Sequence, residues 1–518
     1  MSSQNLRKKF SSIFNIDIIQ ELFYSAIGCI LFFIIYNFFP NRYWDYIYKI
    51  SIILILALIF FLIFVIVNQT SKKNFFKVNY KRNIILFSIV TFAAYLFIFY
   101  NTNWGYNGTS GDNVYRTAYI TQMAHSGIPQ DFGYKGLSAF YSPFYWYCLA
   151  LISLFFQIPP YKMIRIGFLI SCWISPIILF EFWKKIYEEK LAFTITIFSS
   201  IYLISVYSPD HMFGAFLFIP YFIYYFENFT NKKFTKREYL IGGIIGSIAF
   251  CTFFYYFLIV PIYYFISLIQ DRNEFRKKFK HLLYSIILLL LFSIWFWGPL
   301  LKDIILIGFE SHQNNYFGSA LLSFPLINYI GFGVWGVFNT IGLLYIIKNY
   351  KTNRDIKIFG NLLISIHILA LLGLIGILIH FPIMHERIYR LSNYIMVICS
   401  SIFYIKFFYF IKNNKILVKN NINIDIHQIE ILLILILMTA QNISHWAYVA
   451  TSEGYEAARE GAPTRIDKTR DIIEELDYED KVFLMNDWEV SMYLPIYLFL
   501  SFQSLPYKKP YQVKFKKL

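Results

Sequence analysis

Long apolar runs recur along almost the whole chain, and they constrain its fold more than any other feature. A helix that crosses a bilayer needs about 20 consecutive apolar residues, with a range of about 17–25. Runs of this length alternate here with short polar breaks. The chain is 57% hydrophobic and 15% charged, against roughly 45–50% and ~25% in an ordinary soluble domain. A soluble multidomain protein and a disordered chain are excluded, and the sequence predicts an all-α polytopic membrane protein.

The apolar runs predict about 13 transmembrane helices. Most of these are single runs, at 17–39, 47–68, 83–100, 163–182, 191–206, 211–227, 281–300, 326–347, 358–380, 391–411 and 428–448. Residues 239–270 are too many for one straight span and few for two. Both flanks of this run are basic, so we expect a tight hairpin of two short helices with its apex near residues 252–256.

The basic residues predict the orientation of the spans. Cytoplasmic loops of membrane proteins collect Lys and Arg. More than half of the 47 basic residues lie in the N-terminal segment and in the breaks at 71–82, 183–190, 231–238, 271–280, 348–357 and 412–419. The N-terminus is therefore expected on the cytoplasmic side of the plasma membrane and the C-terminus on the outer side. The outer polar regions are then 101–139, 207–210, 302–322 and 382–390.

A short apolar segment at 140–157 does not fit this scheme as a span. The charge balance allows only one crossing between 101–137 and 183–190, and we assign it to 163–182. Residues 140–157 are therefore predicted to form a re-entrant or interfacial helix, which persists at membrane depth only beside protein or a water-filled cavity. The resulting division is a transmembrane domain at 1–448, with a catalytic outer loop at 101–139, and a short extracytoplasmic segment at 449–518.

Asp112 is the first candidate for chemistry. It lies at the start of a helical pattern in the outer segment 111–123. It could act as a helix N-cap, or as a general base that deprotonates a sugar hydroxyl as the hydroxyl attacks. The two roles are compatible, because a helix N-terminus favours the ionised carboxylate.

Asp210 lies on the outer turn 207–210, on the same predicted side as Asp112. One interpretation is a turn that caps the following helix. The alternative is a second catalytic carboxylate that supports the base or a bound metal.

The turn at 382–390 carries two arginines on the outer side, against the positive-inside bias. Arg387 and Arg390 could bind phosphate oxygens through their planar guanidinium groups and stabilise the charge on a leaving polyprenyl phosphate. A structural ion pair with Glu386 is the alternative interpretation.

Other side chains of these outer segments are candidates for substrate contacts. The aromatic residues of 131–146 suit either a sugar-stacking wall or a membrane-interface belt. The candidates are Asn113, Arg116, Lys135, Tyr141 and His385. No nucleotide-binding or metalloprotease motif lies in a soluble context, and no nucleic acid is expected as a partner. The Asp–Asn pair at 112–113 is compatible with chemistry that uses a divalent cation and with chemistry that uses none.

The segments 111–123 and 131–146 resemble the first extracytoplasmic loop of the membrane arabinofuranosyltransferases, which belong to the glycosyltransferase C superfamily. The nearest likeness is to the galactan 5-O-arabinofuranosyltransferase family. It extends to Trp297-Gly298-Pro299-Leu300 and to the tail from Pro506 to Tyr511, and so covers most of 80–518. The resemblance implies an inverting transferase with a polyprenyl-phosphate sugar donor, in which Asp112 is the base.

The sequence thus predicts a membrane glycosyltransferase that moves a sugar, arabinofuranose by resemblance, from a polyprenyl phosphate to a cell-envelope glycan on the outer face. Three alternatives remain open at this point. They are a transporter or flippase of lipid-linked sugars, a related transferase that acts on protein or lipid, and a non-catalytic scaffold of a wall-synthesis complex.

Overall fold

The computed structural model describes residues 21–30, 80–98, 112–131, 137–204, 209–227, 233–307, 324–325, 334–379, 385–412, 482–483 and 501–502. Almost all of these residues are helical. The α-helices are α4 (Tyr80–Ile98), α5 (Asp112–Ser126), α6 (Phe144–Phe156), α7 (Met163–Ile186), α8 (Glu189–Ile204), α9 (Pro209–Tyr221), α10 (Lys236–Thr252), α11 (Ile259–Gln270), α12 (Arg272–Phe292), α13 (Ile294–Ile307), α15 (Val334–Asn349), α16 (Arg354–Leu378) and α17 (Tyr389–Lys412). Shorter helical turns are η1 (Pro160–Lys162), η2 (Phe222–Phe226, a π-helix), η3 (Phe254–Leu258) and η5 (His385–Ile388). Within 449–518, β1 (Val482–Phe483) pairs in parallel with β2 (Ser501–Phe502).

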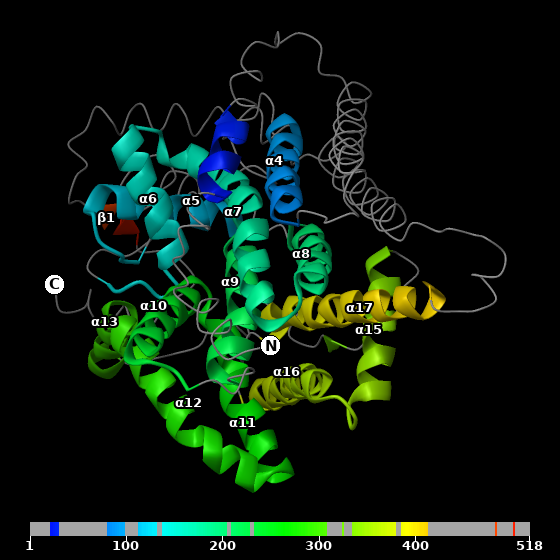
Figure 1. The fold of residues 1–518 in the computed structure, drawn as a ribbon. Helices are drawn as coiled ribbons and strands as arrows, with labels where there is room; N and C mark the ends of the chain where they lie inside the picture. The colour runs from blue at the N-terminus through cyan, green and yellow to red at the C-terminus, as the bar shows by residue number, and fades with distance from the viewer. Residues whose placement is uncertain are drawn as a thin grey trace.

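The helices form a bundle with α7, α8 and α9 at its centre (Figure 1). Helices α10, α12 and α13 lie on one side of this centre, and α15 and α17 lie on the other. One apolar core runs through the bundle and includes fully buried Trp183, Phe198 and Tyr394. A second, smaller core joins α5 to α6 through side chains such as Met123 and Trp146. This second core fixes α5 against the bundle and so positions its N-terminal turn.

Three helical segments of the described residues are long and apolar enough to cross a membrane singly. They are Pro160–Ile186, Arg354–Leu378 and His385–Phe407, and two bent helix pairs raise the number to five. These segments bear out the prediction of a helical membrane protein. The predicted spans 47–68 and 428–448 lie outside the described residues, so the number of 13 stays a prediction.

The predicted interruption within 239–270 is confirmed in position. Helix α10 ends at Thr252, and the two helical arms are bent by 111° at this break. The Thr252 hydroxyl donates to the Ile248 carbonyl over 2.7 Å, a bond that bends helices. The N–H of Phe254, which begins the second arm, donates to Ser142 Oγ at 3.1 Å. Backbone polarity at the break is thereby satisfied from another segment of the chain.

The run predicted as a span at 281–300 is not one straight helix. The helix breaks at Ser293, and α13 is bent by 76° from α12. The Ser293 hydroxyl donates to the carbonyl of Leu289 at 2.8 Å, and the Trp297 indole N–H donates to the carbonyl of Leu290 at 2.9 Å. The Leu289 carbonyl keeps its helical bond from the Ser293 N–H at 3.0 Å. The indole satisfies the Leu290 carbonyl, which a continuing helix would use as an acceptor, so the chain can turn here.

The polar break predicted at 271–280 is also helical, since α12 begins at Arg272. Asp271 caps this helix by accepting hydrogen bonds from the N–H groups of Asn273 (3.0 Å) and Glu274 (2.9 Å). The Glu274 N–H, with a smaller effect of the Asn273 N–H, lowers the pKa of the Asp271 carboxyl from its ordinary value. The sequence reasoning treated these residues as a loop because they are charged.

The short helix predicted at 140–157 is present as α6, which has 13 residues. Phe155 and Phe156 at its end are 81% and 63% exposed on the bundle. A helix of this length is too short to cross a bilayer, as predicted, and its apolar end is suited to an interface with lipid.

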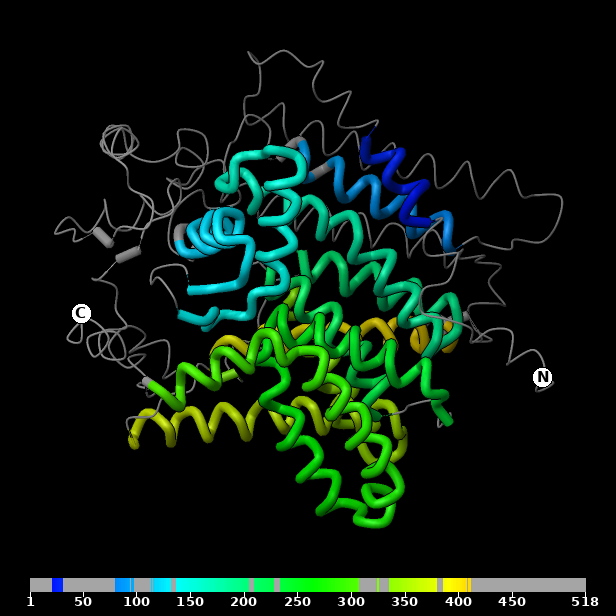
Figure 2. The backbone as a smooth tube through the Cα atoms, turned by 90° about the vertical axis from the view of Figure 1, so that its left-hand side faces the viewer, coloured from blue at the N-terminus to red at the C-terminus, as the bar shows by residue number. Residues whose placement is uncertain are grey.

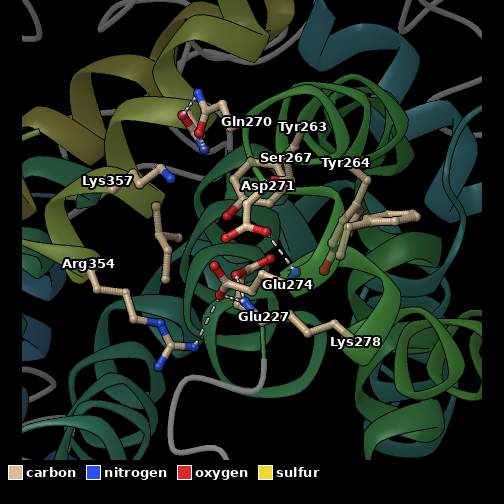
Figure 3. Close-up of a pocket in the computed structure, with 13 residues that line it drawn as sticks. Glu227, Tyr263, Tyr264, Ser267, Gln270, Asp271, Glu274, Lys278, Arg354 and Lys357 are labelled. Carbon is tan, nitrogen blue, oxygen red and sulfur yellow. Dashed lines mark hydrogen bonds and ion pairs between the residues drawn. The ribbon is translucent and has the colours of Figure 1, made fainter. Parts of the chain in front are cut away.

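A polar pocket lies where α11, α12 and α16 meet (Figure 3). Asp210 lies in the first turn of α9, and Glu227 lies at the end of η2, which continues this helix. About 25 Å of helix therefore separates the two residues. Lys278 Nζ lies 2.9 Å from Glu227 Oε2 and 2.8 Å from Glu274 Oε1. The junction of α11 and α12 lies at the end of the bundle away from α5 and α6 (Figure 2). The pocket therefore joins helices at a distance from the residues predicted to carry chemistry.

We expect Lys278→Ala to lower the free energy of unfolding by about 3–5 kcal/mol, because it leaves the buried Glu227 without its cation. Thermal unfolding in detergent micelles measures the loss, and adding Glu227→Gln should recover part of it. The matched control is Arg354→Ala. Arg354 is 39% exposed and lies 4.0 Å from Glu274, so its loss should cost no more than about 1 kcal/mol. Equal losses in the two variants would contradict this interpretation.

Candidate active site

The first turn of α5 begins with Asp112 and carries two of the predicted site residues. Asn113 is buried, and its Oδ1 accepts a hydrogen bond from Arg116 Nη1 at 3.2 Å. The backbone carbonyl of Asn113 accepts from the Thr117 hydroxyl at 2.7 Å. The side chain of Asp112 lies outside the described residues, so its role stays a prediction. The turn that carries it is nevertheless fixed by these bonds.

Helix α9 brings Asp210 to this turn. Pro209 is the first residue of α9, a position that suits proline because its missing N–H would have no helical partner. Asp210 follows it and is 8% exposed. Its Oδ1 lies 3.8 Å from Arg116 Nε, and its Oδ2 lies 3.9 Å from His211 Nε2. The structure therefore brings together a predicted carboxylate of α9 and a predicted guanidinium of α5.

Helix α17 adds a second guanidinium from the other side. Arg390 Nη1 lies 3.3 Å from His211 Nδ1. Because a guanidinium group only donates, Nδ1 is the acceptor, and the ring proton lies on Nε2, which faces Asp210. The Tyr202 hydroxyl donates to the Arg390 carbonyl at 3.1 Å, which fixes the start of α17. His211 thus links Asp210 to Arg390.

The break between α10 and α11 closes the site around His211. The ring of Phe253 lies 4.2 Å from the imidazole ring, centroid to centroid. The Tyr256 hydroxyl donates to the His211 carbonyl at 3.4 Å. Sequence reasoning missed these three residues as site residues. The predicted topology could have indicated them, because it placed both the apex near 252–256 and the turn 207–210 on the outer side, where the site was expected.

Positively charged side chains surround the neighbouring residues Asp210 and His211. Arg390, Arg387 and Arg116 all lie close enough to act electrostatically on the His211 imidazole. The buried Asp210 carboxylate therefore lies within a group of three guanidinium groups. Such groups bind carboxylate and phosphate oxygens through paired N–H donors. The site defined by Asn113, Arg116, Asp210, His211 and Arg390 is referred to below as the guanidinium site.

The turn before α17 holds the remaining predicted arginine and histidine. Arg387 Nε lies 3.7 Å from Glu386 Oε1, so the ion pair considered as an alternative does form. His385 is 1% exposed and packs edge-on to Tyr389 at 5.8 Å. A Cβ placed on Gly373 would lie 2.2 Å from His385 Nδ1. The glycine of α16 is therefore what allows this imidazole to approach the helix.

Lys135 and Tyr141 are the two remaining predicted substrate-binding residues. Lys135 lies outside the described residues. Tyr141 is half-buried, and its carbonyl accepts a hydrogen bond from the Tyr119 hydroxyl of α5 at 2.9 Å. Tyr141 therefore connects to the site through α5.

No group of three or more His, Cys, Asp or Glu side chains that could hold a metal ion is found among the described residues. Asp210 has the Arg116 guanidinium near Oδ1 and the neutral His211 imidazole near Oδ2, with Arg390 on the other side of that ring. This is an unfavourable setting for a divalent cation, since the neighbouring guanidinium charges would repel it.

Comparison with known proteins first shows the class of the fold. The chain is similar to the crystal structure of ArnT from Cupriavidus metallidurans bound to undecaprenyl phosphate, with a TM-score of 0.51 and 11% sequence identity, over 83% of this chain and 88% of that chain. At this identity the likeness concerns the fold alone. The comparison with curated proteins finds no significant match.

The family follows from the sequence model described as "Arabinofuranosyltransferase N terminal", which matches residues 47–440. The chain belongs to this arabinofuranosyltransferase family, and it is a membrane glycosyltransferase. The matched range contains every residue of the guanidinium site. The predicted resemblance is confirmed at the level of the family.

We expect Gly373→Ala to displace the buried His385 ring and to lower the free energy of unfolding by about 1–3 kcal/mol, as overpacking does in a filled core. Thermal unfolding in micelles measures the change. Gly298→Ala in α13 is the matched control, because the nearest atom to its added Cβ is Ile294 Cγ1 at 3.4 Å, an ordinary contact. The interpretation is wrong if both variants unfold at the same temperature as the parent protein.

Proposed function

We propose that this protein transfers arabinofuranose from a polyprenyl-phosphate donor to a cell-envelope glycan, with inversion, on the outer face of the plasma membrane. The observation that carries the proposal is the guanidinium site. Arg116 of α5 and Arg390 of α17 approach the same buried Asp210–His211 pair from two sides. The family supports the sugar and the reaction class. The lipid donor is supported by the undecaprenyl phosphate bound to ArnT, which has the same fold.

The proposed reaction is a single displacement at the anomeric carbon. The acceptor hydroxyl oxygen attacks this carbon, and its proton passes to the Asp112 carboxylate. The bond from the anomeric carbon to the phosphate oxygen breaks, and its electron pair leaves with the polyprenyl phosphate. Arg390 and Arg116 stabilise the charge that develops on that phosphate. One displacement inverts the configuration of the sugar.

Asp210 acts in this proposal as an auxiliary carboxylate and not as the base. Its oxygens face the Arg116 guanidinium and the His211 imidazole. A carboxylate in this position orients positive groups for the phosphate before the donor binds. Arg387 supports the phosphate less strongly, since it is paired with Glu386. His385, Asn113, Tyr141 and Lys135 are proposed to contact the substrates or the residues that bind them.

The phosphate charge is balanced in this proposal by arginine and not by a metal ion held at Asp210, because Arg116 already faces this carboxylate and Arg390 lies on the other side of His211. A divalent cation near Asp112 is a separate question. Transfer assays with EDTA and with added magnesium chloride decide it.

Asp112→Asn should reduce transfer by about 10²–10⁴-fold, since the carboxamide cannot accept the proton of the acceptor hydroxyl. The measurement is release of radiolabel from undecaprenyl-phosphoryl-[¹⁴C]arabinofuranose to a galactan acceptor in proteoliposomes. Glu189→Gln is the control, because Glu189 is an exposed carboxylate at the N-terminus of α8. Full activity of Asp112→Asn would remove Asp112 from the proposed mechanism. Consumption of the donor by the parent protein separates a transferase from a transporter and from a scaffold.

Arg390→Ala should weaken the binding of undecaprenyl phosphate by about 10- to 100-fold, the effect of losing charge-assisted hydrogen bonds to the phosphate. Arg387→Ala should have a smaller effect, because Arg387 is already paired with Glu386. Titration of the purified protein with undecaprenyl phosphate in micelles, followed by native mass spectrometry, gives the affinities. Arg272→Ala, an exposed arginine at the far end of the bundle, is the control. An affinity of Arg390→Ala equal to that of this control would contradict the proposed phosphate site.

A further inference from the structure

Asp303 of α13 forms a contact that none of the proposed roles explains. Its Oδ2 accepts two hydrogen bonds from one residue, Ser138, which lies 165 positions earlier in the chain. The backbone N–H of Ser138 donates over 2.8 Å and the Ser138 hydroxyl over 2.6 Å. Hydrogen bonds to a carboxylate are shorter and roughly twice as strong as neutral ones. Two such bonds to one oxygen form a specific link between α13 and the outer segment.

Ser138 belongs to a strap, defined here as residues 137–143, that is hydrogen-bonded to α13, to α5 and to the α10–α11 break. Next to the Asp303 link, Ser138 forms an antiparallel bridge with Gln130. Further along, the Tyr141 carbonyl accepts from the Tyr119 hydroxyl of α5 at 2.9 Å. Ser142 Oγ then accepts the Phe254 N–H at the α10–α11 break.

The hydrogen-bond partners of Tyr141 and Ser142 lie on elements that carry or contact the guanidinium site. Tyr119 lies on α5, the helix that carries Asn113 and Arg116. Phe254 follows Phe253, whose ring packs on His211. The strap therefore lies between α13 and two elements of the site. The link to α13 is made by a charged side chain, the Asp303 carboxylate.

Helix α13 is suited to hold this link at the membrane surface. It is bent by 76° from α12. Ile305 and Leu306, close to Asp303, are 73% and 71% exposed. A helix with such an apolar face and an inward carboxylate is typical of segments that lie in the membrane interface. The Asp303–Ser138 link therefore connects the interface to the strap.

We propose that Asp303 is a positioning residue, which fixes the strap and through it Tyr141 and the α10–α11 break for sugar transfer. This inference rests on the proposed transferase function. Asp303 does not contact the guanidinium site in the described residues, so it acts on turnover and not on phosphate binding.

The experiment uses the full-length protein in proteoliposomes and micelles, with Asp303→Ala as the main variant. Asp303→Asn keeps one acceptor oxygen and a similar size, so it serves if the alanine variant does not fold. Lys302→Ala is the matched control, an exposed neighbour on the same helix. Hydrogen exchange of the Ser138 amide reports the link itself, independently of any activity. Transfer from undecaprenyl-phosphoryl-[¹⁴C]arabinofuranose and the affinity for undecaprenyl phosphate report its consequence.

We expect faster exchange at Ser138 in Asp303→Ala and a fall in kcat/KM of roughly 10- to 100-fold, the effect of a misplaced positioning group. The unfolding temperature and the affinity for undecaprenyl phosphate should stay close to those of Lys302→Ala. Ser138→Ala keeps the backbone bond and should lose only a few-fold. The double variant Asp303→Ala/Ser138→Ala should be no worse than Asp303→Ala alone, because the two residues act through one link.

Faster exchange with unchanged kcat/KM would overturn the positioning role and leave the proposed function intact. An unchanged exchange rate of the Ser138 amide in Asp303→Ala would overturn the hydrogen-bonded link between Asp303 and Ser138. Parallel losses of transfer, phosphate affinity and unfolding temperature would overturn the positioning role in favour of a purely structural one. Absence of transfer by the parent protein would overturn the proposed function, and with it the role of Asp303, while the exchange measurement would still report the link.

Discussion

Backbone hydrogen bonding at membrane depth is the constraint on which the rest of this structure depends. Within lipid each unpaired N–H or C=O costs several kcal/mol, so a helix can stop only where other groups take over its bonds. The two sharp bends of the described chain meet this condition. At Ser293, the Trp297 indole N–H donates to the Leu290 carbonyl. At the α10–α11 break, Ser142 accepts the first free N–H. A bend inside the bundle therefore requires a partner from elsewhere in the chain, and this requirement ties distant segments together.

The candidate site depends on these contacts between distant segments and on the free-energy cost of buried charge. The α10–α11 break presents Phe253 and Tyr256 to His211, and the bend after α12 carries Asp303 to the strap. Buried carboxylates in turn need cations, because an uncompensated buried charge costs several kcal/mol. Asp210 obtains one from α5 and is linked to another on α17 through His211. The site is thus built from helix ends and breaks that are remote in sequence, and no single local motif could encode it.

The sequence was sufficient for the features that depend on local composition. Apolar runs predicted a helical membrane protein, and the distribution of basic residues correctly located the break within 239–270. It also placed Asp210 and Arg390 on the same predicted side of the membrane. The bend within 281–300 was missed because hydropathy does not distinguish a straight helix from one that bends at Ser293. At this bend the Trp297 indole takes the Leu290 carbonyl, and such a bond has no signature in apolar content. The Asp303–Ser138 link was missed for a similar reason, since 165 residues separate its partners.

The arrangement around Asp210 also gives a reason for the auxiliary role, distinct from the base, that is proposed for this buried carboxylate. Two guanidinium groups near one another repel, and each would tend to turn away from a site that holds no phosphate. The Asp210–His211 pair lies between Arg116 and Arg390 and offers each an acceptor, so both cations stay in place while the site is empty. Donors fixed in advance stabilise developing charge without reorganisation during the reaction. In the proposed mechanism the base must instead face the acceptor hydroxyl, and this role is proposed for Asp112. A carboxylate at the start of a helix is kept ionised by the helix dipole, and ionisation is the state that a base requires.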